Sequence, residues 1–260
     1  MSWTTFSTAI KGRNKTQCQD ATYAAKTGRH IILAVADGVG SHRHSALGSQ
    51  RAIQLVRSLS PRLLESSLPS QDICRRLFSQ VVHQWSRWAH SLPAADTYAP
   101  QFNNVQTTLA IAVIENDDVS VLSIGDSLLF VQGHGGPFLN LLPVQRSDSG
   151  SVNTVGDIDT GARPQELKIN DPTMSKIVLT TDGVERLLMR RPTSDANEKP
   201  FHYVHGSLLA TFDGTDFRDG ESKQKLIDSI SQGLIHRHGA KGDDVGIAAA
   251  FQDSDLPVRP

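Results

Sequence analysis

Short acidic motifs recur along the 260-residue chain and bring carboxylates to the ends of apolar segments. In chain order they are Gln19-Asp20, Asp37-Gly38, Gly125-Asp126, Asp182-Gly183 and Asp243-Asp244. Three follow runs typical of buried strands, and the last precedes such a run. A carboxylate at the point where a strand leaves the core is held in place and still reaches solvent. Several of them together would offer hard oxygen ligands to divalent cations.

The ligand types favour magnesium or manganese over zinc. The two cysteines, Cys18 and Cys74, fit no zinc-binding spacing, and the histidines show no paired arrangement. Two ions held by carboxylates could lower the pKa of a water and present a phosphate ester for attack. The residues alone therefore favour metal-assisted phosphate ester hydrolysis, although other two-metal hydrolases would use the same groups.

Apolar periodicity predicts the elements that must position these carboxylates. Strands are expected over residues 3–9, 20–25, 31–36, 107–114, 119–124, 128–132, 177–181 and 245–251. Helices are expected from Ser45 to a stop at Pro61, and over 71–91, 183–189 and 222–237. The second helix carries Trp85 and Trp88 on its apolar stripe, which favours core packing over a ligand platform.

Turn and loop signals complete the outline. Asn116-Asp117-Asp118 predicts a hairpin between two antiparallel strands. Residues 143–164 are polar and predict a mobile surface loop, and residues 252–260 predict a polar tail. Because no shift in composition marks a boundary, residues 1–260 are expected to form a single domain of antiparallel strands covered by helices.

Bulk properties limit the partners. The formal net charge of −1 gives no global field that would recruit nucleic acid or anionic lipid. No apolar run approaches the roughly 20 residues of a membrane helix, and the first residues lack a signal-peptide pattern. We expect a cytoplasmic protein with no nucleic-acid or membrane partner. It is a monomer by default, since no coiled-coil heptads occur.

Together the motifs resemble the metal-dependent serine/threonine protein phosphatases of type 2C, the PPM family. The matching text is Cys18-Gln19-Asp20-Ala21, Ala36-Asp37-Gly38-Val39-Gly40-Ser41-His42, Thr107-Thr108-Leu109, Ile124-Gly125-Asp126-Ser127, Thr180-Thr181-Asp182-Gly183-Val184 and Lys241-Gly242-Asp243-Asp244. The first of these resembles a bacterial branch of the family. The resemblance implies an α+β fold, a four-layer αββα sandwich in which two antiparallel β-sheets are flanked by helices.

The resemblance also implies roles for individual residues. Two Mg²⁺ or Mn²⁺ ions, and possibly a third, would be held by Asp20, Asp37, the Gly38 carbonyl, Asp126, Asp182 and Asp243. Asp37 would bridge two ions, Asp20 would hold a metal-bound water, and Asp126 would belong to the weaker third site. Asp244 is expected to support Asp243. The catalytic residues would be Asp37, Asp182, Lys15, Arg13 and His42.

Three of these catalytic assignments carry alternatives. Lys15 stands where the family has a phosphate-binding arginine, and the nearby Arg13 could substitute for it. Both could instead be ordinary solvated charges. His42 could protonate the leaving oxygen, or it could be a surface histidine of the loop.

Departures from the family pattern keep a second function open. Gln19 stands where glutamate is frequent, Leu128 where arginine is usual, and Gly246 where serine or threonine is usual. Arg186 replaces the third-metal aspartate, with Glu185 beside it. The main expectation is a phosphatase acting on phosphoserine or phosphothreonine made by a serine/threonine kinase. The rivals are a catalytically weak or inactive binding module for a phosphoprotein or regulatory partner, and a hydrolase of another phosphate ester.

Overall fold

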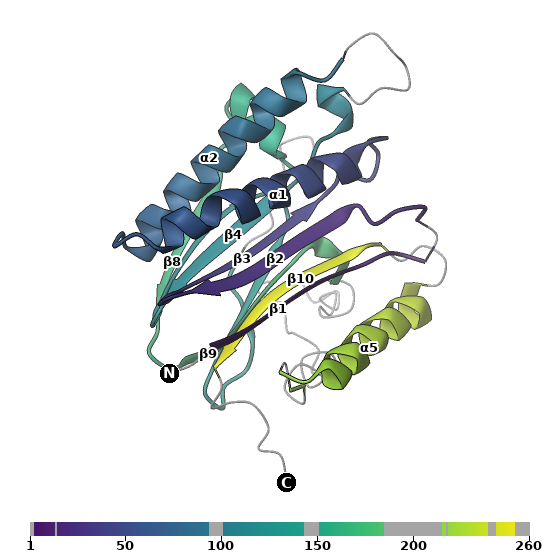
Figure 1. Cartoon of the computed structure of the whole chain (residues 1–260). Helices are drawn as coiled ribbons and strands as arrows, with labels where there is room; N and C mark the ends of the chain where they lie inside the picture. Colours follow the sequence, from purple (N-terminus) through teal and green to yellow (C-terminus); the bar gives the residue numbers. More distant parts are fainter. Residues whose placement is uncertain are drawn as a thin grey trace, which may run out of the picture.

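Two antiparallel β-sheets of five strands each stack at the centre of the computed structural model (Figure 1). The structure describes residues 3–13, 15–93, 101–142, 151–184, 215–216, 218–238 and 243–252. Within these residues every pair of neighbouring strands runs antiparallel. Antiparallel strands can be joined by short turns, and the hairpin expected at Asn116 is confirmed by the pairing of the strands on either side of it.

The first sheet has the strand order β2-β3-β4-β5-β8. Its strands are β2 (Asp20–Thr27), β3 (His30–Asp37), β4 (Leu109–Glu115), β5 (Asp118–Ile124) and β8 (Gln165–Asn170). The second sheet has the order β1-β10-β9-β6-β7. Its strands are β1 (Trp3–Ile10), β10 (Val245–Gln252), β9 (Met174–Thr180), β6 (Leu128–Gly133) and β7 (Leu139–Asn140).

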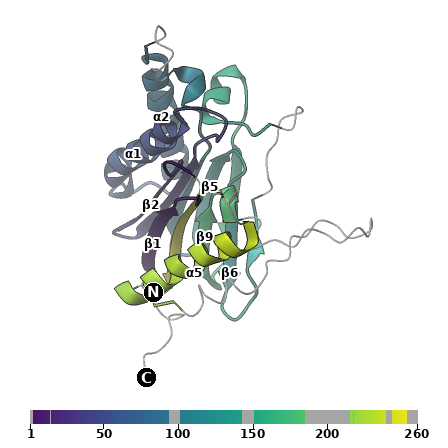
Figure 2. The same cartoon turned by 90° about the vertical axis from the view of Figure 1, so that its right-hand side faces the viewer.

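Helices cover the outer face of each sheet, which gives four layers (Figures 1 and 2). Helices α1 (Ser45–Leu64) and α2 (Ser70–His90) lie on the first sheet, and α5 (Gly220–His238) lies on the second. Short 3-10 helices are η1 (Phe102–Asn104), η2 (Val155–Thr160) and η3 (Asp182–Val184). The α+β sandwich of two antiparallel sheets flanked by helices is therefore confirmed.

Three apolar layers hold the sandwich together. One lies between α1, α2 and the first sheet, the second between the two sheets, and the third between the second sheet and α5. Trp85 of α2 is fully buried in the first layer, and its indole N–H donates to the Gly48 carbonyl of α1 at 3.0 Å. The Trp85 ring therefore packs in the core, as its helical spacing predicts. Large apolar side chains are thus buried on both faces of each sheet.

Two expectations about local structure were wrong. Pro61 does not stop the first helix, because α1 continues to Leu64. A proline in the last turn removes only one helical N–H, and the added turn buries Leu64 in the core. The described part of the expected 143–164 loop is also more ordered than predicted. It contains η2, and Val155 at the start of η2 is fully buried against the α2 layer.

Several sequence expectations fall on residues outside the described ranges. They are Glu185 and Arg186, the helix expected beyond Val184, the residues Lys241-Gly242, the first part of the loop at 143–150, and the tail from residue 253. Among the helices that the structure describes, none is long and apolar enough to cross a membrane.

Candidate metal centre

Three of the expected carboxylates converge at one end of the two sheets. One oxygen each of Asp37, Asp126 and Asp182 lies within 4.8 Å of the others. Asp37 is the last residue of β3, Asp126 lies in the turn between β5 and β6, and Asp182 opens η3 directly after β9. Both sheets thus contribute, and each carboxylate sits where a strand leaves the core. Three acidic groups at this spacing have the chemistry of a divalent-cation site.

Asp20 extends this group because β2 and β3 pair in register at their ends. Asp20 and Asp37 are Cα partners, and their carboxyl groups share a hydrogen bond. Asp20 is only 5% exposed, and the Thr181 hydroxyl donates to its Oδ2 at 2.6 Å. That hydroxyl in turn accepts the Gly246 N–H at 2.8 Å. Thr181 therefore fixes Asp20 from the opposite sheet, a role that the sequence did not reveal.

The surroundings of Asp37 and Asp20 disfavour the negatively charged form of their carboxyl groups. Burial raises the pKa of Asp37 well above its usual value, and the charges of Asp20 and Asp182 raise it further. Burial also raises the pKa of Asp20 to about 6, although its hydrogen bonds with Asp37 and Thr181 oppose the change. Buried carboxylates that repel one another either hold protons or need a cation. The local electrostatics therefore favour a divalent ion at this place.

The loop after Asp37 is shaped by backbone contacts that require particular residues. The Asp37 carbonyl accepts the Thr107 hydroxyl and the Thr108 N–H, both at 2.8 Å, and the Asp37 N–H donates to the Thr108 hydroxyl at 3.0 Å. A Cβ on Gly38 would lie 2.6 Å from the Ser45 carbonyl group, so only glycine fits. The Thr-Thr and Asp-Gly motifs are thus two halves of one local structure that aims the Asp37 side chain.

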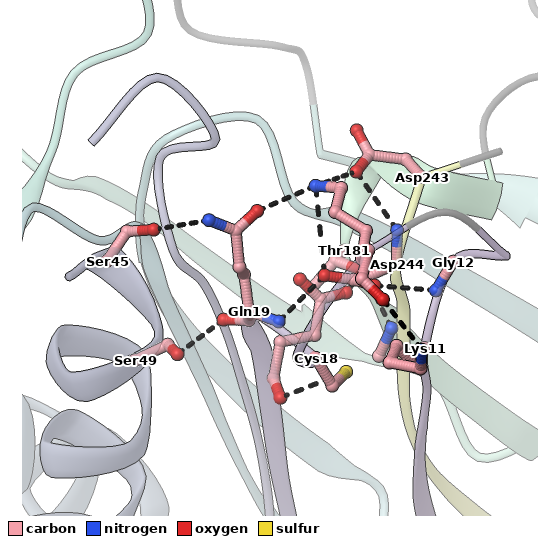
Figure 3. A network of polar contacts seen from close by, with 12 residues as sticks. Lys11, Gly12, Cys18, Gln19, Ser45, Ser49, Thr181, Asp243 and Asp244 are labelled. Carbon is pink, nitrogen blue, oxygen red and sulfur yellow. Dashed lines mark hydrogen bonds and ion pairs between the residues drawn. The ribbon is translucent and has the colours of Figure 1, made fainter. Parts of the chain in front are cut away.

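Asp243 is close to this group but is not part of the three converging carboxylates. Its Oδ1 lies 2.7 Å from the Lys15 Nζ, and its side chain is 57% exposed. The adjacent Asp244 is 2% exposed and accepts the N–H groups of Gly12 and Gln19 at 2.6 and 2.7 Å. Asp244 therefore holds the loop before β2 against the start of β10 (Figure 3). Its backbone N–H also donates to the Asp243 Oδ1 at 3.0 Å.

The other expected catalytic residues differ in how closely they lie to the acidic group. Lys15 pairs with Asp243 beside the three converging carboxylates, whereas Arg13 is exposed at the surface of the same loop. His42 is half-buried in the turn before α1, and its N–H donates to the Val39 carbonyl at 2.9 Å. Burial raises the pKa of the half-buried Cys18 thiol to about 12, so the thiol is protonated and a poor nucleophile at neutral pH.

Comparison with known proteins matches the sequence and the fold to one family. The sequence profile described as protein phosphatase 2C matches residues 11–227. Among solved structures, the serine/threonine phosphatase Stp1 from Staphylococcus aureus is 14% identical with a TM-score of 0.67, and the alignment covers 96% of this chain and 94% of that one. PppA, a regulatory component of the T6SS in Pseudomonas aeruginosa, is 18% identical with a TM-score of 0.67, over 96% and 98% of the two chains.

A further solved structure, that of RsbX in complex with magnesium, is 14% identical with a TM-score of 0.56, over 96% of this chain and 94% of that one. No curated protein sequence matches the chain significantly. The profile match spans most of the chain, and this chain belongs to the protein phosphatase 2C family. Its enzyme class is that of the phosphoprotein phosphatases, and metal dependence is general to the family.

Proposed function

We propose that this chain hydrolyses phosphoserine and phosphothreonine in proteins with the help of two Mg²⁺ or Mn²⁺ ions. The observation that carries the proposal is the convergence of Asp37, Asp126 and Asp182 within 4.8 Å at the ends of both sheets. Membership of a phosphatase family gives this acidic site its chemical context. We also propose that residues 1–260 form one phosphatase domain.

The donor set fits the ions that the family uses. The carboxylates are oxygen ligands, and the raised pKa values of Asp20 and Asp37 indicate that uncompensated negative charge is unfavourable there. Asp37, Asp126 and Asp182 would hold the ions, with the Gly38 carbonyl, Asp20 and Asp243 completing the set. When bound, the ions lower the pKa of a water so that hydroxide can attack phosphorus at neutral pH. The position of Asp126 beside Asp37 and Asp182 supports a role for it as a ligand, either of the two main ions or of a third ion.

The chain's own residues would handle the substrate and the leaving group. Lys15 would place a positive charge on the phosphate oxygens, and Arg13 could add a second charge from the same loop. His42, in the turn before α1, or a water held at the metal site would deliver a proton to the serine or threonine oxygen as it leaves. We expect no phosphoenzyme, because the nucleophile is a water and not a side chain.

The substrates would be proteins phosphorylated by a serine/threonine kinase in the cytoplasm. The free thiols of Cys18 and Cys74 fit a reducing compartment. No nucleic-acid or membrane partner is proposed, and a monomer is the default state.

Hydrolysis of a phosphothreonine peptide with manganese, with magnesium and with chelator tests the proposal. We expect phosphate release with either metal, none with chelator, and none from Asp37→Asn at unchanged circular dichroism. Asp171→Asn, in the turn between β8 and β9 at the end of β9 away from Asp182, is a matched control and should keep full activity. Turnover by Asp37→Asn at the wild-type rate would refute the assignment of the metal centre.

One observation favours the rival binding module. Lys15, Gln19 and Asp243 are already linked by hydrogen bonds and an ion pair, which could suit recognition without turnover. This rival predicts that the folded protein retains a phosphothreonine peptide with either metal and releases no phosphate. Release of phosphate by the wild-type protein decides against it.

A further inference from the structure

Gln19 lies at the centre of a polar network that links Asp243 and Asp244 to helix α1 (Figure 3). Its side-chain Oε1 accepts a hydrogen bond from the Lys15 Nζ at 2.7 Å, and its Nε2 donates to the Ser45 hydroxyl at 2.7 Å. Its backbone is held as well: the carbonyl accepts the Gly38 N–H at 3.0 Å and the Ser49 hydroxyl. Both ends of this residue are therefore fixed by other parts of the fold.

Hydrogen-bond chemistry determines which way the Gln19 amide faces. A lysine ammonium can only donate, so the atom facing Lys15 must be the amide oxygen. The amide nitrogen then faces Ser45, whose hydroxyl accepts. Ser45 is fully buried at the first turn of α1. The helix thus orients the amide, and the amide orients the ammonium group.

The placement leaves the Lys15 ammonium with capacity for a ligand. Lysine has three N–H donors, and contacts among the described residues at hydrogen-bond distance use two of them, at Gln19 and at Asp243. Asp244 is 3.8 Å away, beyond hydrogen-bond distance. A Cβ on Gly40 would lie 3.7 Å from the Gln19 Oε1 and 3.8 Å from the Lys15 Nζ. Gly40 places no side chain against this pair, and the Lys15 side chain is 30% exposed.

We propose that Gln19, oriented by Ser45, is a positioning residue that holds the Lys15 ammonium for a phosphate oxygen of the substrate. The proposal rests on the proposed function. A neutral amide suits this task because Asp243 and Asp244 already supply negative charge beside Lys15. Glutamate would keep the hydrogen bond but would add a third negative charge where a phosphate must bind.

Partial burial lowers the pKa of Lys15, but the hydrogen bond to Asp243 and the charges of Asp243, Asp244 and Asp37 outweigh that effect and raise it overall. The ammonium therefore stays charged at neutral pH. A lysine in this position differs from an arginine because it has no planar fork that fixes its direction. An external acceptor such as Gln19 supplies the direction that the side chain lacks.

The test compares Gln19→Met, which keeps the side-chain length and removes both amide contacts, with the matched surface control Gln50→Met on the exposed face of α1. The first readout needs no turnover. The rate at which acetic anhydride modifies Lys15 is followed by mass spectrometry, with the exposed Lys168 as internal reference. We expect the relative rate at Lys15 to rise several-fold in Gln19→Met and to stay unchanged in Gln50→Met. An unchanged rate in Gln19→Met overturns the proposal.

The second readout is steady-state hydrolysis of a phosphothreonine peptide with manganese. We expect Gln19→Met to raise KM about tenfold with kcat within about twofold, as expected for loss of a hydrogen bond to a charged group. In the Lys15→Met background, Gln19→Met should not raise KM further. Gln19→Glu should keep the slow modification of Lys15 seen in the wild type but should still raise KM. A fall in kcat at unchanged KM, or additive effects of the two methionine substitutions, overturns the proposal. If the wild-type protein shows no turnover, the proposed function fails while the modification rate still decides the Gln19–Lys15 contact.

Discussion

Replacing Asp20 with asparagine should stabilise the metal-free protein. Asp20 is buried, and its pKa rises from the ordinary value of 3.8 to about 6 because burial disfavours its charge. The folded protein therefore binds the proton more tightly than the unfolded chain does. The free energy of unfolding then falls as pH rises from about 4 through about 6, because folding must give up that proton or bury the charge. The asparagine side chain would carry no charge at any pH and would escape this loss.

The magnitude follows from the change in pKa. A change from 3.8 to about 6 corresponds to about 3 kcal/mol at neutral pH if the whole proton belongs to Asp20, and to less where Asp37 shares the proton. The amide can preserve the geometry. Its oxygen can accept the Thr181 hydroxyl, which donates to Asp20 at 2.6 Å, and its N–H can donate to Asp37. Asparagine thus keeps the contacts and removes the electrostatic cost.

Urea unfolding in the presence of chelator measures this effect. Wild type and Asp20→Asn are compared from about pH 4 to about pH 7, and we expect the two curves to meet near pH 4 and separate as pH rises. Asp171→Asn is the control, since hydrogen bonds from Thr173 lower the pKa of the exposed Asp171 and its titration falls below this window. Parallel curves for wild type and Asp20→Asn across the whole range would refute the electrostatic account of the site.

Three further substitutions test individual contacts. Gly48→Ala should prevent normal folding or cost several kcal/mol in urea unfolding, because its Cβ would lie 1.7 Å from the Val105 carbonyl oxygen. Trp85→Phe should lower the unfolding free energy by about 1–3 kcal/mol, since it removes a buried hydrogen bond and leaves a small cavity; an unchanged urea midpoint would contradict this. Thr181→Val should weaken manganese binding several-fold in calorimetry by releasing the Asp20 carboxylate, and unchanged affinity would argue against that positioning role.

Local patterns in the sequence predict the strands of both sheets except β7 and β8. Buried strands such as β3 are continuous apolar runs, so the sequence shows where each strand ends and its next side chains leave the core. This pattern predicts the strand-end positions of Asp37 and Asp182. Strand β8 was missed because the polar residues of Gln165–Asn170 alternate with only two apolar ones, Leu167 and Ile169. An edge strand of this kind resembles a loop when it is read without its partner.

Contacts between distant segments could not be predicted from the sequence. The contact of Lys15 with Asp243 depends on the pairing of β1 with β10. The contact of Gln19 with Ser45 depends on the packing of α1 on the first sheet. The grouping of Asp126 with Asp37 and Asp182 has the same origin, because the strands before these residues belong to two sheets. Spacing along the chain carries no information on these distances, which depend on how the two sheets stack.

The central claim is that the carboxylates at the strand ends form a divalent-metal centre. Calorimetric titration of manganese into the metal-free wild-type protein and into Asp37→Asn tests it most directly, without requiring a substrate. The account predicts at least two ions per wild-type chain and loss of the tighter binding in Asp37→Asn, which removes the charge expected to serve both ions. Equal stoichiometry and affinity in the two proteins would contradict the account.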